Sequence, residues 1–252
     1  MNKYLKNLNR IEFVVTMACT GRCKHCSEGE HVSDGVHIDG EAGARAVRDL
    51  CGVYQIQSLM TFGGEPLLYS EEVCKIHEAA RECGIPKRQL ITNGFFSWEQ
   101  ERIREVVHSL AESGVNQILL SADAFHQETI PLETVLHFGE RVIKEGIPVK
   151  MNPAYLVSRE HDNPYNIRTR EILGAFAEIN ILTSDGNVIF PAGNARKYLG
   201  EYFEDGAEYV NPYDEDPADL HTVSFNPDGS ALGGNINRDH ILDIIAAYRP
   251  AC

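Results

Sequence analysis

The chain has 252 residues, of which 43% are hydrophobic and 24% are charged. This composition is that of a globular protein and excludes a disordered chain, a collagen-like repeat and a coiled coil. With 23 Lys and Arg against 37 Asp and Glu, the formal net charge is -14. A surface this acidic disfavours nucleic acid and anionic membrane surfaces as partners.

The amino-terminal residues lack the apolar core of a signal peptide, and the sequence has no apolar run of the length that spans a bilayer. The seven cysteines are an odd number, and their clustering does not suit a disulfide framework. We therefore expect a cytoplasmic protein whose thiols are reduced and free to bind metal.

Apolar, β-branched segments alternate with helical patterns along most of the chain. The pattern predicts strands over residues 10–16, 58–62, 88–92, 116–122, 148–157 and 179–191, the last kinked at Asp185 and Gly186, and helices over 39–54, 70–83, 97–112, 132–145 and 168–178. This order favours an α/β fold with parallel strands, either an open doubly wound sheet or a barrel of about six β/α units. In both folds, functional groups gather at the carboxyl ends of the strands.

The carboxyl-terminal fifth of the chain differs in character from residues 1–200, which hold the β/α units. Residues 201–219 carry eight acidic and no basic side chains, which predicts an acidic surface connector. Residues 220–252 predict a small appendage, a hairpin across the turn at 226–229 followed by a helix over 238–248.

Three cysteines follow the first predicted strand in C-x3-C-x2-C spacing: Cys19, Cys23 and Cys26. Three thiolates on one short loop suit three irons of a [4Fe–4S] cluster and leave the fourth iron open. A zinc site of three Cys and one His is the alternative, although this spacing differs from the paired C-x2-C of zinc ribbons. The candidate fourth ligands are His25, His31 and His37.

A second motif, Gly63-Gly64-Glu65-Pro66, lies directly after the second predicted strand. The glycines let a backbone approach a ligand closely, and Glu65 supplies negative charge for a cation. Alone, this tetrapeptide is an ordinary turn. Together with the cysteine triplet, it resembles the GGEP motif of the radical S-adenosylmethionine (radical SAM) superfamily.

The resemblance implies a partial (β/α)6 barrel of the radical SAM type over about residues 10–195, with the cluster at its open top. It implies that Gly63, Gly64, Glu65 and Pro66 hold the methionine ammonium of S-adenosylmethionine. It also implies, more weakly, cofactor contacts from groups that follow the later strands: Asn93, Ser121, Asp123 and Asn152. The implied reaction is reductive cleavage of S-adenosylmethionine to a 5′-deoxyadenosyl radical, which abstracts hydrogen from the substrate.

Asp123 and His126 are candidate catalytic groups because they follow the fourth strand, and a histidine is readily neutral or charged near neutral pH. A histidine that caps or packs against the next helix is an equally good interpretation. Cys51, Cys74 and Cys83 fall on helical patterns and are expected to be buried as small hydrophobic residues. Cys252 is expected to be a free thiol.

The segment 225–236 resembles the hairpin of SPASM or twitch extensions, which bind auxiliary clusters through several cysteines. This chain has no cysteine between Cys83 and Cys252, so an auxiliary cluster is not expected. The tail favours a peptide or protein substrate over a small metabolite, by analogy alone. The expected electron donor is a reduced flavodoxin or ferredoxin. The alternatives are a glycyl-radical-enzyme activase and a non-enzymatic iron–sulfur or zinc module.

Overall fold

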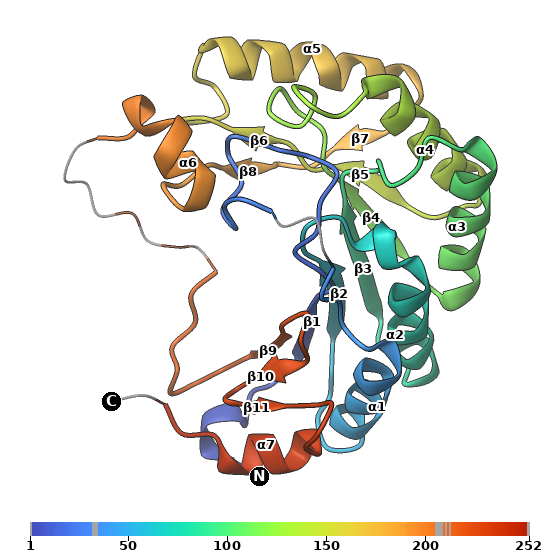
Figure 1. The fold of residues 1–252 in the computed structure, drawn as a ribbon, viewed down its shortest axis with the longest axis vertical. Helices are drawn as coiled ribbons and strands as arrows, with labels where there is room; N and C mark the ends of the chain where they lie inside the picture. The colour runs from blue at the N-terminus through green and yellow to red at the C-terminus, as the bar shows by residue number, and fades with distance from the viewer. Residues whose placement is uncertain (1, 32–34, 205–208, 210, 212, 251–252) are drawn as a thin grey trace.

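The computed structural model describes residues 2–31, 35–204, 209, 211 and 213–250 (Figure 1). Its main sheet has seven strands in the order β7-β5-β4-β3-β2-β1-β9, and every neighbouring pair is parallel. These strands are β1 (Arg10–Val14), β2 (Ser58–Phe62), β3 (Lys87–Thr92), β4 (Gln117–Leu120), β5 (Val149–Met151), β7 (Leu182–Thr183) and β9 (Thr222–Phe225).

Two small sheets accompany it. One is a parallel pair, β6 (Ala154–Tyr155) with β8 (Asn187–Val188), and the other is an antiparallel pair, β10 (Ser230–Ala231) with β11 (Gly234–Asn235). The α-helices are α1 (Gly40–Cys51), α2 (Ser70–Glu82), α3 (Gln100–Ser113), α4 (Leu132–Lys144), α5 (Pro164–Glu178), α6 (Gly193–Tyr198) and α7 (Ile241–Ala247). The short 3-10 helices are η1 (Lys3–Leu5), η2 (Pro66–Tyr69) and η3 (Gly200–Tyr202).

The main core lies between the sheet and helices α1 to α4, which cover its outer, convex face (Figure 1). Alternate residues of each strand enter this core because side chains of a strand point to opposite faces. Ile11 and Phe13 of β1 are fully buried there, and Phe13 stacks on Phe225 of β9 at 4.7 Å between ring centroids. Each such side chain contributes about 1.5–3 kcal/mol by leaving water.

The predicted fold class is confirmed. Six strands of the main sheet, β1 to β5 and β7, follow one another in chain order with helices between them, as in a partial (β/α)6 barrel. The last predicted strand is broken into β7 and β8 at Asp185 and Gly186, where Gly186 has a φ of 71°. No helix in the part of the chain that the structure describes is both long and apolar enough to cross a membrane.

The carboxyl-terminal segment pairs differently from the expected hairpin. Strand β9 joins the main sheet next to β1, and the antiparallel ladder forms between β10 and β11 instead. One edge of β1 pairs with β2, and the other edge offers hydrogen-bonding groups to the backbone of β9. If β9 paired in a local hairpin instead, these groups of β1 would lose their partners. The division at residues 200 and 219 stays a prediction, and within the connector residues 205–208, 210 and 212 lie outside the described residues, as does Cys252.

Candidate functional site

The three cysteines of the motif lie on the loop that follows β1, at the carboxyl edge of the sheet. Cys23 is buried, and Cys19 and Cys26 are partly exposed, and all three thiols are free. Asn194 of α6 holds this loop from the other side: its Nδ2 donates to the carbonyl of Cys23 at 3.2 Å and its backbone N–H to that of Cys26 at 2.9 Å. These two hydrogen bonds join the backbone of the cysteine loop to α6.

The chemistry of these thiols fits an iron–sulfur cluster. Burial raises the pKa of Cys19 to about 11 and raises the pKa of Cys23 and of Cys26 above the usual range. Three thiols with raised pKa values in one place stay protonated unless a cation compensates the charge of their thiolates, and a bound metal does this. Cys19 Sγ also accepts a hydrogen bond from the Gly21 N–H at 3.4 Å, as ligating sulfurs commonly do.

The Gly63-Gly64-Glu65-Pro66 segment lies against the end of β1. The N–H of Gly64 donates to the carbonyl of Thr16 at 2.7 Å, and the N–H of Glu65 donates to that of Ala18 at 2.8 Å. A Cβ on Gly64 would lie 2.1 Å from the Ala18 carbonyl oxygen, and Gly63 has a φ of 135°. The glycines are thus required for the contact between this segment and the start of the cysteine loop.

Glu65 is fully buried and its carboxylate connects two strand ends. Oε1 accepts from the Leu67 N–H at 2.9 Å and from Thr92 Oγ1 at 2.8 Å, and Oε2 accepts from the Asn93 N–H at 2.9 Å. Burial raises its pKa to about 7, against the opposing effect of these hydrogen bonds. The carboxylate first of all fixes the local backbone, and a contact with a ligand ammonium stays a prediction.

The other strand-end candidates differ in what they contact. Asn93 faces the cysteine loop, since its Nδ2 lies 3.6 Å from Cys19 Sγ and donates to Thr20 Oγ1 at 3.2 Å. The backbone N–H of Ser121 donates to Thr92. The side chain of Asn152 instead accepts from Ser184 Oγ at 2.9 Å. Their proposed roles toward the cofactor stay predictions.

Asp123 and His126 lie together beneath the cysteine loop. The Asp123 carboxylate is fully buried and accepts the N–H groups of Phe125, His126 and Ala154 at 2.9–3.0 Å. His126 Nδ1 is 2.9 Å from Asp123 Oδ1. Burial alone would raise the pKa of Asp123, but the charge of His126 and its contact with the carboxylate hold that pKa well below the usual range. Asp123 therefore acts first as an anchor for this loop.

The histidines proposed for a zinc site are separated. His31 Nε2 lies 3.1 Å from Cys26 Sγ, whereas the His25 ring packs on His126 at 4.9 Å and joins a group of potential ligand atoms with Cys23. His37 stacks on Tyr69 at 4.0 Å. Because His31 and His25 serve different thiols, these contacts do not single out one Cys3His set.

The sequence did not indicate the role of α6. Asn194 is 171 residues from Cys23, and no motif marks it. The signal is a second, smaller core, in which Cys23 packs with Ala195 of α6, Ala154 of β6 and Ile189, which follows β8. Only the folded chain brings these segments together.

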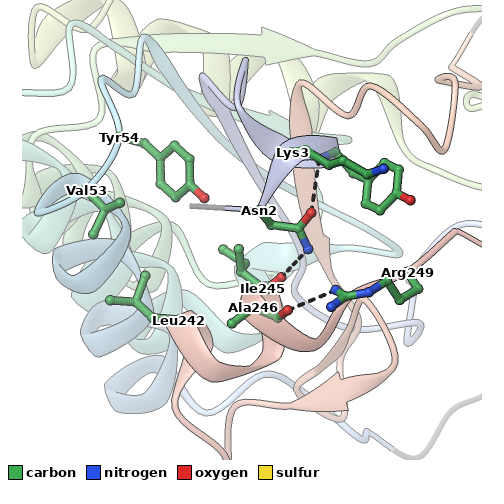
Figure 2. A pocket seen from close by; sticks show the side chains of 9 residues that line it. Asn2, Lys3, Val53, Tyr54, Leu242, Ile245, Ala246 and Arg249 are labelled. Carbon is green, nitrogen blue, oxygen red and sulfur yellow. Dashed lines mark hydrogen bonds between the residues drawn. The ribbon is translucent and has the colours of Figure 1, made fainter.

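A pocket of about 590 Å³ lies elsewhere, beside α7 at the amino ends of the strands (Figure 2). It is lined by Asn2, Lys3, Tyr4, Val53, Tyr54, Leu242, Ile245, Ala246 and Arg249. The Asn2 side chain donates to the carbonyl of Ile245 at 2.7 Å, which ties η1 to α7. This pocket is at the opposite edge of the sheet from the three cysteines and is not the candidate active site.

A partial (β/α)6 barrel with three free thiols on one loop at its carboxyl edge suits a protein that binds an iron–sulfur cluster. The model of the Radical SAM superfamily matches residues 13–179, and the chain therefore belongs to this superfamily. The cofactors of this superfamily, a [4Fe–4S] cluster and S-adenosylmethionine, are accordingly those of this chain.

Curated relatives include GTP 3′,8-cyclase of Clostridium perfringens (strain SM101 / Type A), 24% identical over 194 residues that cover 68% of this chain and 58% of the relative. The protein of the same name from Desulforamulus reducens is 25% identical over 164 residues, 62% of this chain and 48% of the relative. The chain thus spans about half the length of these relatives.

Similar solved structures include Streptococcus suis SuiB bound to the precursor peptide SuiA, with a TM-score of 0.58 and 12% identity over 95% of this chain and 65% of that one. Native anSMEcpe with bound AdoMet has a TM-score of 0.58 and 14% identity over 94% of this chain and 80% of that one. At these sequence identities, the similarity to the two structures shows a shared fold and nothing finer.

Proposed function

We propose that this enzyme cleaves S-adenosylmethionine reductively and abstracts hydrogen from a peptide or protein substrate. The observation that carries this proposal is the fixed junction of the cysteine loop with Gly63-Gly64-Glu65-Pro66 at the carboxyl edge of the barrel. When bound and reduced, the cluster supplies one electron that cleaves S-adenosylmethionine, and the resulting 5′-deoxyadenosyl radical takes a hydrogen atom from the substrate.

The residues of this chain have distinct tasks in the proposal. Cys19, Cys23 and Cys26 ligate three irons. The backbone around Gly64 and Glu65 binds the methionine end of S-adenosylmethionine, and Gly64 keeps this backbone in contact with the start of the cysteine loop. The remaining strand-end candidates, Asn93, Ser121, Asp123 and Asn152, and the neighbouring His126 orient the cofactor or the substrate from the sides.

The inner face of the sheet carries an uncharged pair of amide side chains, Gln89 and Gln117, which suits a peptide substrate. Leu90 of β3 belongs to the main core, so the adjacent Gln89 points to the opposite, concave face. Gln89 is 5% exposed, and its Nε2 donates to Gln117 Oε1 at 2.6 Å. The other amide atoms of this pair, a carbonyl oxygen and N–H donors, match a peptide group.

The same face also carries charged side chains. Arg10 is paired with Glu12 on the same strand, so its guanidinium is already compensated. A triphosphate is bound by several cations, and the alternation of β3 and β5 also directs Lys87 and Lys150 to this face. A nucleotide is therefore the second candidate substrate, and the curated relatives are named GTP 3′,8-cyclase.

The test is an anaerobic assay with the reconstituted enzyme, dithionite and S-adenosylmethionine, in which 5′-deoxyadenosine is quantified beside Cys23→Ala. We expect product that is lost in the variant, and reduced flavodoxin or ferredoxin should replace dithionite. A tryptic peptide pool should stimulate product formation more than GTP does. Stimulation by GTP alone would refute the peptide assignment, and a cluster-loaded enzyme that yields no 5′-deoxyadenosine with either addition would refute the activity.

A further inference from the structure

Helices α1 and α2 pack side by side with matched registers. A Cβ on Gly40 would lie 2.9 Å from the Cα of Glu72, and a Cβ on Gly43 would lie 3.0 Å from Ile76 Cγ1. The two glycines therefore bring the helices unusually close at their amino ends. Further along, Arg48 donates from both Nε and Nη2 to Glu82 Oε2, at 3.1 and 2.8 Å.

These contacts join residues whose numbers differ by 32, 33 and 34. Both helices connect parallel strands in the same direction, so they run parallel to each other, and an offset of 32 to 34 is expected at their carboxyl ends too. There α1 ends at Cys51, and Cys83 is the C-cap residue of α2, a difference of 32. The register thus places the two cysteines opposite each other.

Both thiols are free and partly exposed, contrary to the expectation that they would be buried. They adjoin the main core at its edge, where a small reagent can reach them. Burial and then the neighbouring Cys83 thiol raise the pKa of Cys51 to about 12. This agrees with the neighbouring positions that the packing of the two helices gives the cysteines.

We propose that Cys51 and Cys83 form a redox-active dithiol, which a small disulfide such as glutathione disulfide converts into an intramolecular disulfide bond. The site lies at the carboxyl ends of α1 and α2, at the opposite edge of the sheet from the cysteine loop. It is independent of the proposed activity.

The reaction is two successive thiol–disulfide exchanges. The thiolate of one cysteine attacks a sulfur of glutathione disulfide, forms a mixed disulfide and releases one glutathione thiolate. The second cysteine, as its thiolate, attacks the protein sulfur of that mixed disulfide and releases the second glutathione. The two protein thiols lose two protons and two electrons, and glutathione disulfide is reduced to two glutathione molecules.

The bond would clamp α1 to α2 by closing a loop of about 32 residues, which restricts the unfolded chain. The clamp joins the helix that follows the cysteine loop to the helix that follows the Gly63-Gly64-Glu65-Pro66 segment. For a chain of this size we expect the thermal midpoint to rise by about 10 °C on oxidation.

The experiment equilibrates the reconstituted protein anaerobically in a series of glutathione and glutathione disulfide buffers. Free thiols are then blocked by alkylation, and tryptic peptides are analysed by mass spectrometry. Because trypsin leaves Cys51 and Cys74 on one peptide, residues 49–75, the Cys74→Ser variant is used beside the native sequence. Cys74 is also partly exposed and lies on α2, so this variant is the matched control for loss of a thiol.

We expect peptide 49–75 linked to peptide 82–87 in the native protein and in Cys74→Ser, with the rise in thermal midpoint reversed by dithiothreitol. Cys51→Ser and Cys83→Ser should show neither the link nor the rise. Separate glutathione adducts on Cys51 and Cys83 without the linked peptide would overturn the proposal, as would unmodified thiols at the most oxidising ratio.

Discussion

The contact between Gly64 and the cysteine loop can be tested by adding one methyl group. In Gly64→Ala, the new Cβ would lie 2.1 Å from the carbonyl oxygen of Ala18 and 2.7 Å from its carbonyl carbon. Carbon and oxygen atoms normally approach no closer than about 3.3 Å. Both neighbours are backbone, which no rotamer change can move, so the two segments must separate by about 1 Å.

That separation removes two short backbone hydrogen bonds. The N–H of Gly64 donates to Thr16 at 2.7 Å and that of Glu65 to Ala18 at 2.8 Å. Each lost bond costs about 1 kcal/mol, and buried groups left without partners cost about as much again. We expect the free energy of unfolding to fall by about 2–4 kcal/mol. With a urea slope of about 3 kcal/mol/M for a chain of this size, the midpoint falls by about 1 M.

The assay is urea unfolding followed by circular dichroism, with Gly174→Ala as the control. Gly174 lies inside α5, and no atom lies within 4 Å of its added Cβ. Since Ala is a better helix former than Gly by about 1 kcal/mol, the control should unfold at an equal or higher urea concentration. If Gly64→Ala matches the native protein while holding its normal iron content, the close backbone contact is not what fixes the loop.

Three further predictions concern buried groups of the site. Because burial raises the pKa of Glu65 from 4.5 to about 7, the folded state binds this proton more tightly than the unfolded state does. About 3 kcal/mol of stability is therefore fully present below pH 4.5 and is lost as the pH rises to 7. Urea midpoints measured across this range should show this slope in the native protein and not in Glu65→Gln. The pKa of Asp123 is depressed, so the stability that this carboxylate contributes is present above its ordinary pKa and is lost in acid. Asp123→Asn should lower the free energy of unfolding by about 2–4 kcal/mol at pH 7, measured by thermal unfolding. The control Asp185→Asn, at a fully exposed carboxylate, should cost nothing measurable. Cys23→Ser should reduce iron per chain at least about tenfold after reconstitution, and Cys74→Ser should leave it unchanged; equal iron in both would refute the assignment of the cluster to this loop.

Local patterns predicted the elements whose boundaries depend on nearby residues. The strand over 58–62 has the predicted bounds because it ends at Gly63, whose positive φ stops the ladder. The helix predicted over 168–178 begins earlier, at Pro164, where the Asn163 side chain caps it by accepting the Asn166 N–H at 2.9 Å. That signal, a capping residue followed by proline, was present in the sequence.

Features that depend on distant residues were not predictable in this way. The strand expected over 148–157 divides around Pro153, which has no N–H to donate to the ladder, and its second part pairs with β8. Likewise, no local pattern indicates that 222–225 joins β1 across more than two hundred residues. The cysteines and Gly63-Gly64-Glu65-Pro66 were recognisable because their chemistry is local, whereas Asn194 was not, because it acts only through tertiary contact.

The site owes its geometry to backbone contacts made from two sides. From one side, Gly64 and Glu65 join the strand ends to Thr16 and Ala18, so the start of the cysteine loop, the turn after β2 and the end of β3 are held as one unit. From the other side, Asn194 holds the carbonyls of the loop over a separate small core. The thiols therefore lie at the junction of two packed units, and their positions depend on both. This explains why two short motifs indicate the chemistry of the chain while the placement of that chemistry requires the whole barrel.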